Sequence, residues 1–177
     1  MRFRRVGWGL LIVLGLFLAT YVIAWAQASR LTTSYWRDAE AAYARGGYLE
    51  ALTGYREFDS LQNKYVQRGG YQQVENIWSH PNAWPRPEVY AQARTRIQEI
   101  ITQRMTITMA EAYVQAHIGK SNPYLGDVYL RLGELYEVGG DPRSAIEVYR
   151  EIADLFSARS DLIDRANGHL TSLGIQH

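Results

Sequence analysis

The feature that most constrains the fold is an uncharged apolar stretch near the N-terminus. It runs from Val6 to Ala28, a length of 23 residues without Asp, Glu, Lys or Arg. As a helix rising ~1.5 Å per residue it would be roughly 34 Å long, which is enough to cross the ~30 Å hydrocarbon core of a bilayer. Trp8 lies near its start, and Tyr21 and Trp25 lie near its end, where aromatic rings favour the headgroup region. We therefore expect residues 6–28 to form a transmembrane helix.

The end of this stretch also has the pattern of a signal-peptide cleavage site. Ala24-Trp25-Ala26 and Ala26-Gln27-Ala28 both place small residues two positions apart. The apolar core of a signal peptide is usually shorter, about 7–15 residues, so the length of the stretch favours a retained anchor. A cleaved, soluble extracytoplasmic binding protein stays open as the alternative.

Charges on either side of the span predict its orientation. Three arginines precede it and charges of both signs follow it: Arg2, Arg4 and Arg5, then Arg30, Arg37, Asp38 and Glu40. The positive-inside rule makes residues 1–5 a basic cytoplasmic tail. We expect a single-pass protein of the cell membrane, with residues 29–177 on the extracytoplasmic side.

Two small residues within the span could allow another helix to approach closely. Gly15 and Ala19 form a small-xxx-small pair, a pattern found where transmembrane helices pack together. They are our candidates for contacts between membrane helices. Small residues that simply face lipid are the alternative.

Residues 29–177 are numerous enough for one domain with a real core, and their pattern predicts an all-α fold. A helix from about Tyr48 would carry one apolar face, formed by Leu49, Leu52, Tyr55 and Phe58. A second apolar stripe runs from Glu88 to Gly119, with an interruption at residues 106–108. Between the two lies the sequence "WSHPNAWPRP", residues 78–87, whose prolines predict an irregular loop.

The clearest pattern is "YLRLGELYEVGGDPRSAIEVYREI", from Tyr129 to Ile152. Two helices are joined by Gly139-Gly140-Asp141-Pro142, where glycine ends one helix and proline begins the next. This passage resembles a tetratricopeptide repeat. Seven residues carry the resemblance at the family's spacing: Tyr129, Leu132, Gly133, Tyr136, Gly140, Ala145 and Tyr149. The resemblance implies a short α-solenoid of antiparallel helix pairs after the membrane helix, with the best repeat at residues 124–158.

Two further segments fit this interpretation. The sequence "GGYLEALTGYREF", from Gly46 to Phe58, repeats the glycine turn, the alanine and the tyrosine of the second helix. Residues 160–173 carry an apolar face formed by Leu162, Ala166, Leu170 and Leu173. We expect this last segment to be a capping helix that closes the stack.

The sequence offers little that indicates catalysis. The four histidines are scattered without the spacing that places two metal ligands on one helical face: His80, His117, His169 and His177. Acids on the predicted helices have basic neighbours at helical range, as Glu147 has Arg143 and Arg150. The chain contains no cysteine, GxSxG elbow, P-loop or GxGxxG motif. We predict no catalytic, cofactor-binding or metal-binding residues, and a net charge of +1 argues against nucleic acid as a partner.

Aromatic residues make up 12% of the chain, and aromatic side chains often anchor protein interfaces. We predict contact residues around the irregular loop, namely Tyr71, Trp78, Trp84, Arg86 and Tyr124. For each aromatic, packing between helices is the alternative. Arg86 could meet an acidic partner or anionic headgroups.

The expected function is that of a non-catalytic, membrane-anchored interaction subunit. It would scaffold or stabilise a multi-subunit bacterial membrane complex from the extracytoplasmic side, such as an electron-transport complex or a translocon. Its partners would be other subunits, mainly integral membrane proteins, with residues 6–28 contacting the bilayer. Two alternatives stay open: the cleaved soluble binding protein, and a membrane-tethered hydrolase with paired carboxylates beside residues 78–87.

Overall fold

The computed structural model describes residues 2–175, and the side chains of residues 11–175. The described chain is mostly helical, with 71% of residues in helices and eight α-helices. It divides into two compact units between Thr95 and Arg96, and each unit buries its own set of apolar side chains. The predicted helical fold is therefore confirmed at this level, with one exception in the first unit.

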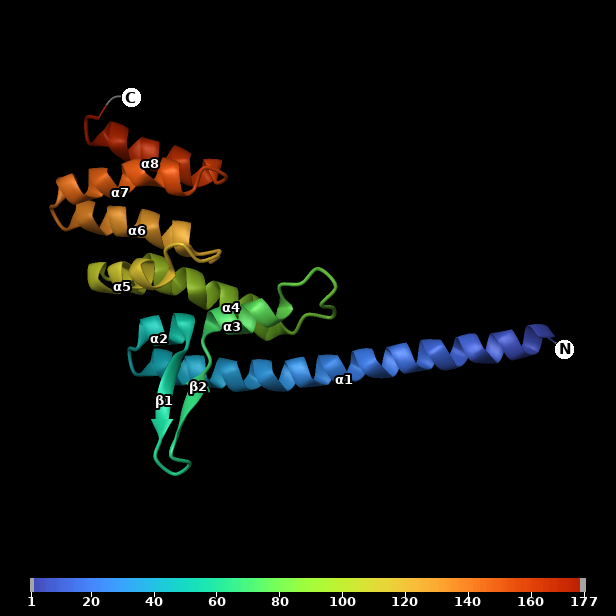
Figure 1. The fold of residues 1–177 in the computed structure, drawn as a ribbon. Helices are drawn as coiled ribbons and strands as arrows, with labels where there is room; N and C mark the ends of the chain where they lie inside the picture. The colour runs from blue at the N-terminus through green and yellow to red at the C-terminus, as the bar shows by residue number, and fades with distance from the viewer. Residues whose placement is uncertain (1, 176–177) are drawn as a thin grey trace. The chain divides into compact units, whose positions relative to one another are not determined.

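The first unit is built on α1 (Arg2–Ala44), a single helix of 43 residues. At ~1.5 Å per residue it is roughly 65 Å long. Its N-terminal half extends away from the rest of the unit (Figure 1). Its C-terminal half enters the core, where Thr32, Ala39 and Ala42 are buried. The helix shows no break at Ala28, where the predicted transmembrane segment ends.

Two short helices pack on the C-terminal half of α1: α2 (Tyr48–Thr53) and α3 (Tyr71–Trp78). Their buried side chains are Ala51, Leu52, Tyr71, Val74 and Trp78. The Trp78 indole Nε1 donates a hydrogen bond to Thr32 Oγ1 at 2.7 Å, across 46 residues of sequence. The core of this unit therefore depends on large aromatic side chains of α3.

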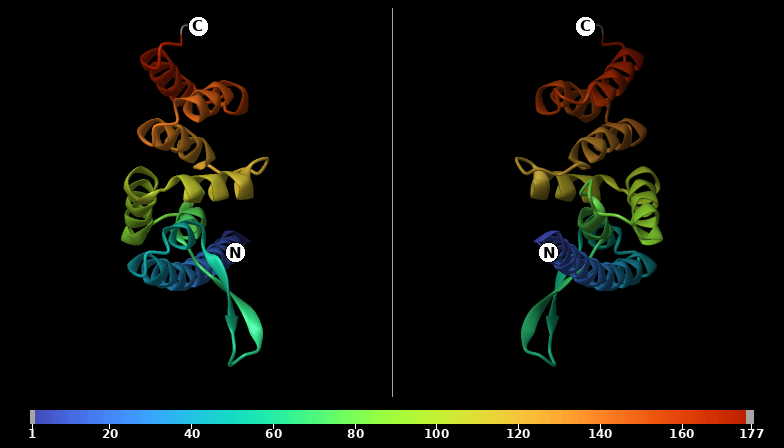
Figure 2. Two further views of the ribbon diagram at one scale, coloured as in Figure 1. Left: turned by 90° about the vertical axis from the view of Figure 1, so that its left-hand side faces the viewer. Right: turned by 90° about the vertical axis from the view of Figure 1, so that its right-hand side faces the viewer.

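A β-hairpin interrupts the helices of the first unit and corrects the all-α prediction. Strand β1 (Tyr55–Asp59) pairs antiparallel with β2 (Lys64–Arg68), in the register Tyr55↔Arg68 to Asp59↔Lys64. The hairpin projects beyond the helices of its unit (Figure 2). In its turn Asp59 Oδ1 accepts hydrogen bonds from the amides of Leu61 and Gln62.

Gly54 explains why the predicted helix from Tyr48 stops before Tyr55 and Phe58. Its φ is +73°, and a Cβ at this position would lie 2.6 Å from the carbonyl oxygen of Arg68. Only glycine adopts such a conformation readily, so the chain leaves the helix here and runs into β1. The run of apolar residues at a spacing of three is too short to distinguish a continuous helix from a helix end followed by a strand.

The helix α4 (Glu88–Glu99) crosses the boundary between the units and continues as a π-helical segment, η1 (Ile100–Arg104). The chain then becomes extended at Met105, and Thr106 caps α5 (Ile107–His117) by accepting a hydrogen bond from the amide of Met109 at 3.3 Å. The stripe is therefore interrupted at residues 105–106, which overlaps the predicted interruption at residues 106–108 only at Thr106.

Three helices complete the second unit: α6 (Leu125–Val138), α7 (Pro142–Leu155) and α8 (Ser160–Ser172). Helix α6 packs against α5, α7 and α8. It approaches α7 closely at Gly133, where an added Cβ would lie 2.4 Å from Cε1 of Tyr149. Asp141 caps α7 by accepting a hydrogen bond from the amide of Ser144 at 3.1 Å.

Candidate functional site

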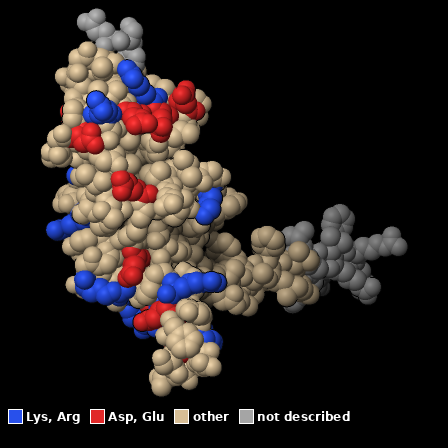
Figure 3. All heavy atoms as spheres, turned by 60° about the vertical axis from the view of Figure 1, so that its left-hand side comes forward, with Lys and Arg blue, Asp and Glu red and all other residues tan. Residues whose placement is uncertain are grey.

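The first candidate surface is the exposed apolar half of α1. Among the described residues, α1 is the one helix long and apolar enough to cross a membrane. From Leu11 to Ile23 its large apolar side chains are 41–77% exposed. This part of the helix carries no charged side chain, and Figure 3 shows its described surface as uniformly uncharged up to the atoms drawn in grey. Such a surface is unfavourable in water and favourable in lipid.

The loop between α3 and α4 folds back onto this helix. The Tyr21 hydroxyl donates a hydrogen bond to the carbonyl of Trp84. The Trp25 indole Nε1 donates to the carbonyl of Pro85 at 3.0 Å. An apolar cleft of about 240 Å³ lies between helix and loop, lined by Tyr21, Val22, Trp25 and Pro85. Hydrogen bonds therefore hold residues 79–87 against the C-terminal end of the predicted transmembrane segment.

The second candidate surface is the hairpin. Phe58 and Tyr65 pair across the strands, with ring centroids 5.3 Å apart, and are 48% and 71% exposed. Leu61 in the turn is 98% exposed. A two-stranded hairpin is marginally stable by itself in water, and these exposed apolar side chains make it a candidate interaction surface.

Sequence reasoning missed the hairpin, although signals for it are present. Gly54 and the pair Gly69-Gly70 bound the segment, and Asp59 and Asn63 are turn residues at its centre. The flanking runs contain aromatic and β-branched residues, which favour strands. Reading these turn signals together would have predicted two strands in place of a helix.

The third candidate surface is a cleft of about 410 Å³ in the second unit. Its walls include Ile118, Lys120, Leu125, Tyr129, Leu155 and Phe156. The nearby face of α7 carries charges of both signs, because Glu147, Glu151 and Asp154 are exposed together with Arg143 and Arg150. The Tyr129 hydroxyl donates to Glu151 and connects the cleft with this face.

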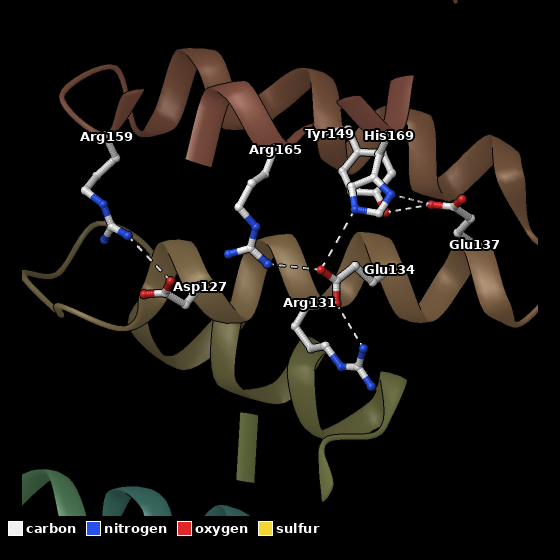
Figure 4. A network of polar contacts seen from close by, with 8 residues as sticks. All are labelled: Asp127, Arg131, Glu134, Glu137, Tyr149, Arg159, Arg165 and His169. Carbon is white, nitrogen blue, oxygen red and sulfur yellow. Dashed lines mark hydrogen bonds and ion pairs between the residues drawn. The ribbon is translucent and has the colours of Figure 1, made fainter. Parts of the chain in front are cut away.

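A network of polar contacts joins α6, α7 and α8 (Figure 4). Glu137 accepts hydrogen bonds from the Tyr149 hydroxyl at 3.0 Å and from His169 Nδ1 at 2.9 Å. Because a carboxylate can only accept, this contact places the His169 proton on Nδ1. The His169 ring also stacks on Tyr149, with centroids 4.8 Å apart. The second carboxylate, Glu134, accepts from Arg131 at 2.9 Å and from Arg165 at 3.3 Å.

The acids of this network are paired with hydrogen-bond donors, which suits a structural role. A general acid or base needs a proton that it can exchange with a substrate, whereas Glu134 and Glu137 hold helices together. Among the described residues no cluster of three or more His, Cys, Asp or Glu side chains could hold a metal ion.

Tyrosine–carboxylate pairs should make the second unit sensitive to alkaline pH. The hydrogen bond to Glu111, together with burial, raises the pKa of Tyr136 from 10.0 to about 12. Burial and a carboxylate partner also raise the pKa of Tyr129 and of Tyr149. A tyrosine whose pKa is higher in the folded state stabilises the fold below its unfolded pKa, and this stability is lost as pH rises through the folded pKa.

We expect the melting temperature of the chain in detergent to fall as pH rises from about 10 to about 12. Tyr136→Phe removes one titrating hydroxyl, so its melting temperature should fall less steeply over this interval, measured by far-UV circular dichroism. If the melting temperature falls equally steeply with pH in both proteins, the pKa of Tyr136 is the same in the folded and unfolded states.

The structure separates the predicted contact residues into two groups. Tyr71, Trp78 and Tyr124 are 0%, 2% and 8% exposed, so they pack inside the units and do not form a contact surface. Each large ring fills space between helices, which is the alternative that the sequence left open. Trp84 is 74% exposed, and Arg86 is exposed on the same loop. These two remain predicted contact residues.

The predicted helix-contact pair lies on the exposed part of α1. Gly15 and Ala19 are both exposed, and nothing lies within 4 Å of a Cβ built at Gly15. The pair is therefore accessible to another membrane helix, and its role stays a prediction.

Comparison of the chain with protein-family models, with curated proteins and with solved structures found no match.

Proposed function

We propose that the protein is a non-catalytic, membrane-anchored interaction subunit that scaffolds or stabilises a multi-subunit bacterial membrane complex. The observation that carries this proposal is the continuity of α1. One helix has an exposed apolar half from Leu11 to Ile23 and a second half that contributes Thr32, Ala39 and Ala42 to a folded core. A surface of the first kind is stable in lipid, and the second half holds the domain directly beside it.

Retention of the anchor is supported by the position of the possible cleavage site. Residues 24–29 lie inside the continuous helix α1. Trp25 packs edge-on against the buried Trp78, with ring centroids 6.1 Å apart. Cleavage after Ala26 or Ala28 would remove this ring from the core of the first unit. The arginines before the span support the proposal that the domain lies on the extracytoplasmic side.

The second unit supports a tetratricopeptide-like arrangement of α6, α7 and α8. Gly133 and the fully buried Ala145 stand where close helix approach is required, and Gly140 has the positive φ, +81°, of a helix-ending glycine. Tyr149 fills the space beside Gly133. Stacked helix pairs of this kind present surfaces for binding other proteins.

The hairpin is the surface that we propose docks onto a partner subunit. Its apolar side chains, Phe58, Leu61 and Tyr65, are exposed on strands that contact the rest of the unit mainly at their base. A partner with an apolar surface, or with a strand that pairs along the hairpin edge, would cover them.

Gentle solubilisation of membranes followed by purification through a C-terminal tag tests this function. The wild-type chain should recover at least one other membrane subunit. The double variant Leu61→Asp, Tyr65→Asp should reduce that recovery about tenfold or more, because burying two charges at an interface is costly. Its helical content should not change.

Val138→Asp is the matched control, because Val138 is 86% exposed but belongs to the second unit. It should recover the partner normally. Recovery of the wild-type chain alone would contradict a subunit role. If the hairpin variant recovers the partner as well as the wild-type chain does, the docking site lies outside the hairpin.

A further inference from the structure

We propose that the loop of residues 79–87, between α3 and α4, is a second membrane contact that lies in the headgroup region beside α1. In this arrangement Trp84 enters the lipid and Arg86 faces the phosphate groups. The inference rests on the proposed anchoring of α1, and it adds a lipid-binding site outside the transmembrane helix.

The level of the loop along α1 is the first argument. The backbone of Trp84 is bound to the Tyr21 side chain and that of Pro85 to the Trp25 side chain. Tyr21 lies seven residues before Ala28, the last residue of the predicted transmembrane segment, which is about 10 Å along the helix. Figure 1 shows the loop extending beside α1 toward its apolar half. A bilayer that covers the apolar surface of α1 therefore reaches the loop.

The length of the span agrees with this position. About 20 helical residues cross the ~30 Å hydrocarbon core, so a core that begins at Val6 ends near Trp25. Tyr21 and Trp25 then lie at the boundary between hydrocarbon and headgroups, where Tyr and Trp are enriched. The loop bound to them shares this level.

The backbone of the loop suits a region with little water. Backbone polar groups removed from water need internal partners. Three loop residues, Pro81, Pro85 and Pro87, have no N–H group to satisfy. The amides of Asn82 and Ala83 donate to His80, at 3.2 and 3.0 Å.

Side chains of the membrane helix satisfy further polar groups of the loop. The Tyr21 hydroxyl and the Trp25 indole donate hydrogen bonds to two loop carbonyls, and the Trp84 amide donates to the Tyr21 oxygen at 3.4 Å. Such internal partners contribute more where little water is present to satisfy the same groups.

The exposed side chains of the loop match the chemistry of a lipid surface. Trp84 is 74% exposed although its backbone is fixed, and its ring would join Tyr21 and Trp25 in one aromatic belt. The loop contains no acid, and the Arg86 guanidinium lies 5.1 Å from the centre of the Tyr90 ring in an exposed position. Arginine near the membrane surface is attracted to anionic headgroups.

Spin labelling can test this directly, because the chain has no cysteine of its own. The full-length protein is reconstituted alone into vesicles of phosphatidylcholine and phosphatidylglycerol. A nitroxide is attached at Asn82→Cys in the loop, at Leu61→Cys in the hairpin, or at Leu14→Cys in the span. Collisions with oxygen, which enters lipid, and with a water-soluble nickel chelate are then compared.

The label at position 82 should collide with the nickel chelate about threefold less often than the label at position 61, and more often than the label at position 14, as expected for the interface. Adding Trp84→Ser to the position-82 protein should raise its nickel collisions. This second substitution distinguishes insertion of the indole from simple proximity to the bilayer.

The measurements distinguish failure of the loop proposal from failure of the proposed anchor. If position 14 is shielded and position 82 is as accessible as position 61, the loop proposal is wrong and the anchor stands. That outcome would also be expected if the loop bound a protein partner, because the vesicles contain none. If position 14 is fully accessible to nickel, the proposed anchor itself is wrong.

Discussion

Trp78→Ala is expected to lower the free energy of unfolding of the first unit by about 3–5 kcal/mol, the usual cost of removing a fully buried aromatic side chain. Trp78 is 2% exposed, packs edge-on against Trp25 and donates a hydrogen bond to Thr32. Its loss would leave a large cavity beside α1. Urea unfolding in detergent, followed by far-UV circular dichroism, measures the effect.

Two further variants separate packing from hydrogen bonding at this position. Trp78→Phe keeps an aromatic ring beside Trp25 but removes the donor, so it should cost less, about 1–2 kcal/mol. Thr32 would still donate to the carbonyl of Ala28, at 2.8 Å. The control is Trp84→Ala, whose side chain is 74% exposed, and its stability should change by less than about 0.5 kcal/mol. Equal losses for Trp78→Ala and Trp84→Ala would refute the assigned core.

Gly133→Ala is expected to destabilise the second unit by about 1–3 kcal/mol, although alanine normally stabilises helices. The new Cβ would lie 2.4 Å from the Tyr149 ring. That ring cannot move aside easily, because it is 1% exposed, stacks on His169 and donates to Glu137. Helices α6 and α7 would have to separate.

Gly168→Ala provides the matched control within the same unit. Gly168 lies in α8, is exposed, and has nothing within 4 Å of the position that an added Cβ would take. The same substitution should therefore stabilise the unit there by about 0.5–1 kcal/mol. Thermal melting of both variants compares the two signs. A stabilised Gly133→Ala protein would show that α6 and α7 do not approach each other as described.

Two strong local signals in the sequence predicted parts of the structure well. The apolar stretch from Val6 predicted a membrane-length helix, and the Gly-Gly-Asp-Pro turn predicted the end of α6 and the start of α7. Both signals are strong because each depends on many residues or on backbone restrictions that few residues meet. Residues 160–173, the expected last helix, form α8 at Ser160–Ser172.

The turn residues around the hairpin are a weaker signal, because each of them is compatible with more than one local structure. Whether Tyr55 continues a helix or begins a strand depends on Gly54 and on the distant Arg68, which meet only in the folded chain. Composition likewise cannot distinguish Trp78, which is buried, from Trp84, which is exposed six residues later. Pairing of loop carbonyls with Tyr21 and Trp25 is a tertiary event with no local signal.

If α1 spans a bilayer as proposed, its unbroken course determines how far from the membrane the hairpin lies. The base of the hairpin is held at Asp38, whose Oδ2 accepts a hydrogen bond from the amide of Gly69. Asp38 lies 17 residues beyond Tyr21, about 26 Å farther along the helix. In the proposed membrane arrangement, the continuous helix between Tyr21 and Asp38 would keep the hairpin at a nearly constant distance from the bilayer. A partner that docks on the hairpin would then have to present its complementary surface at that distance.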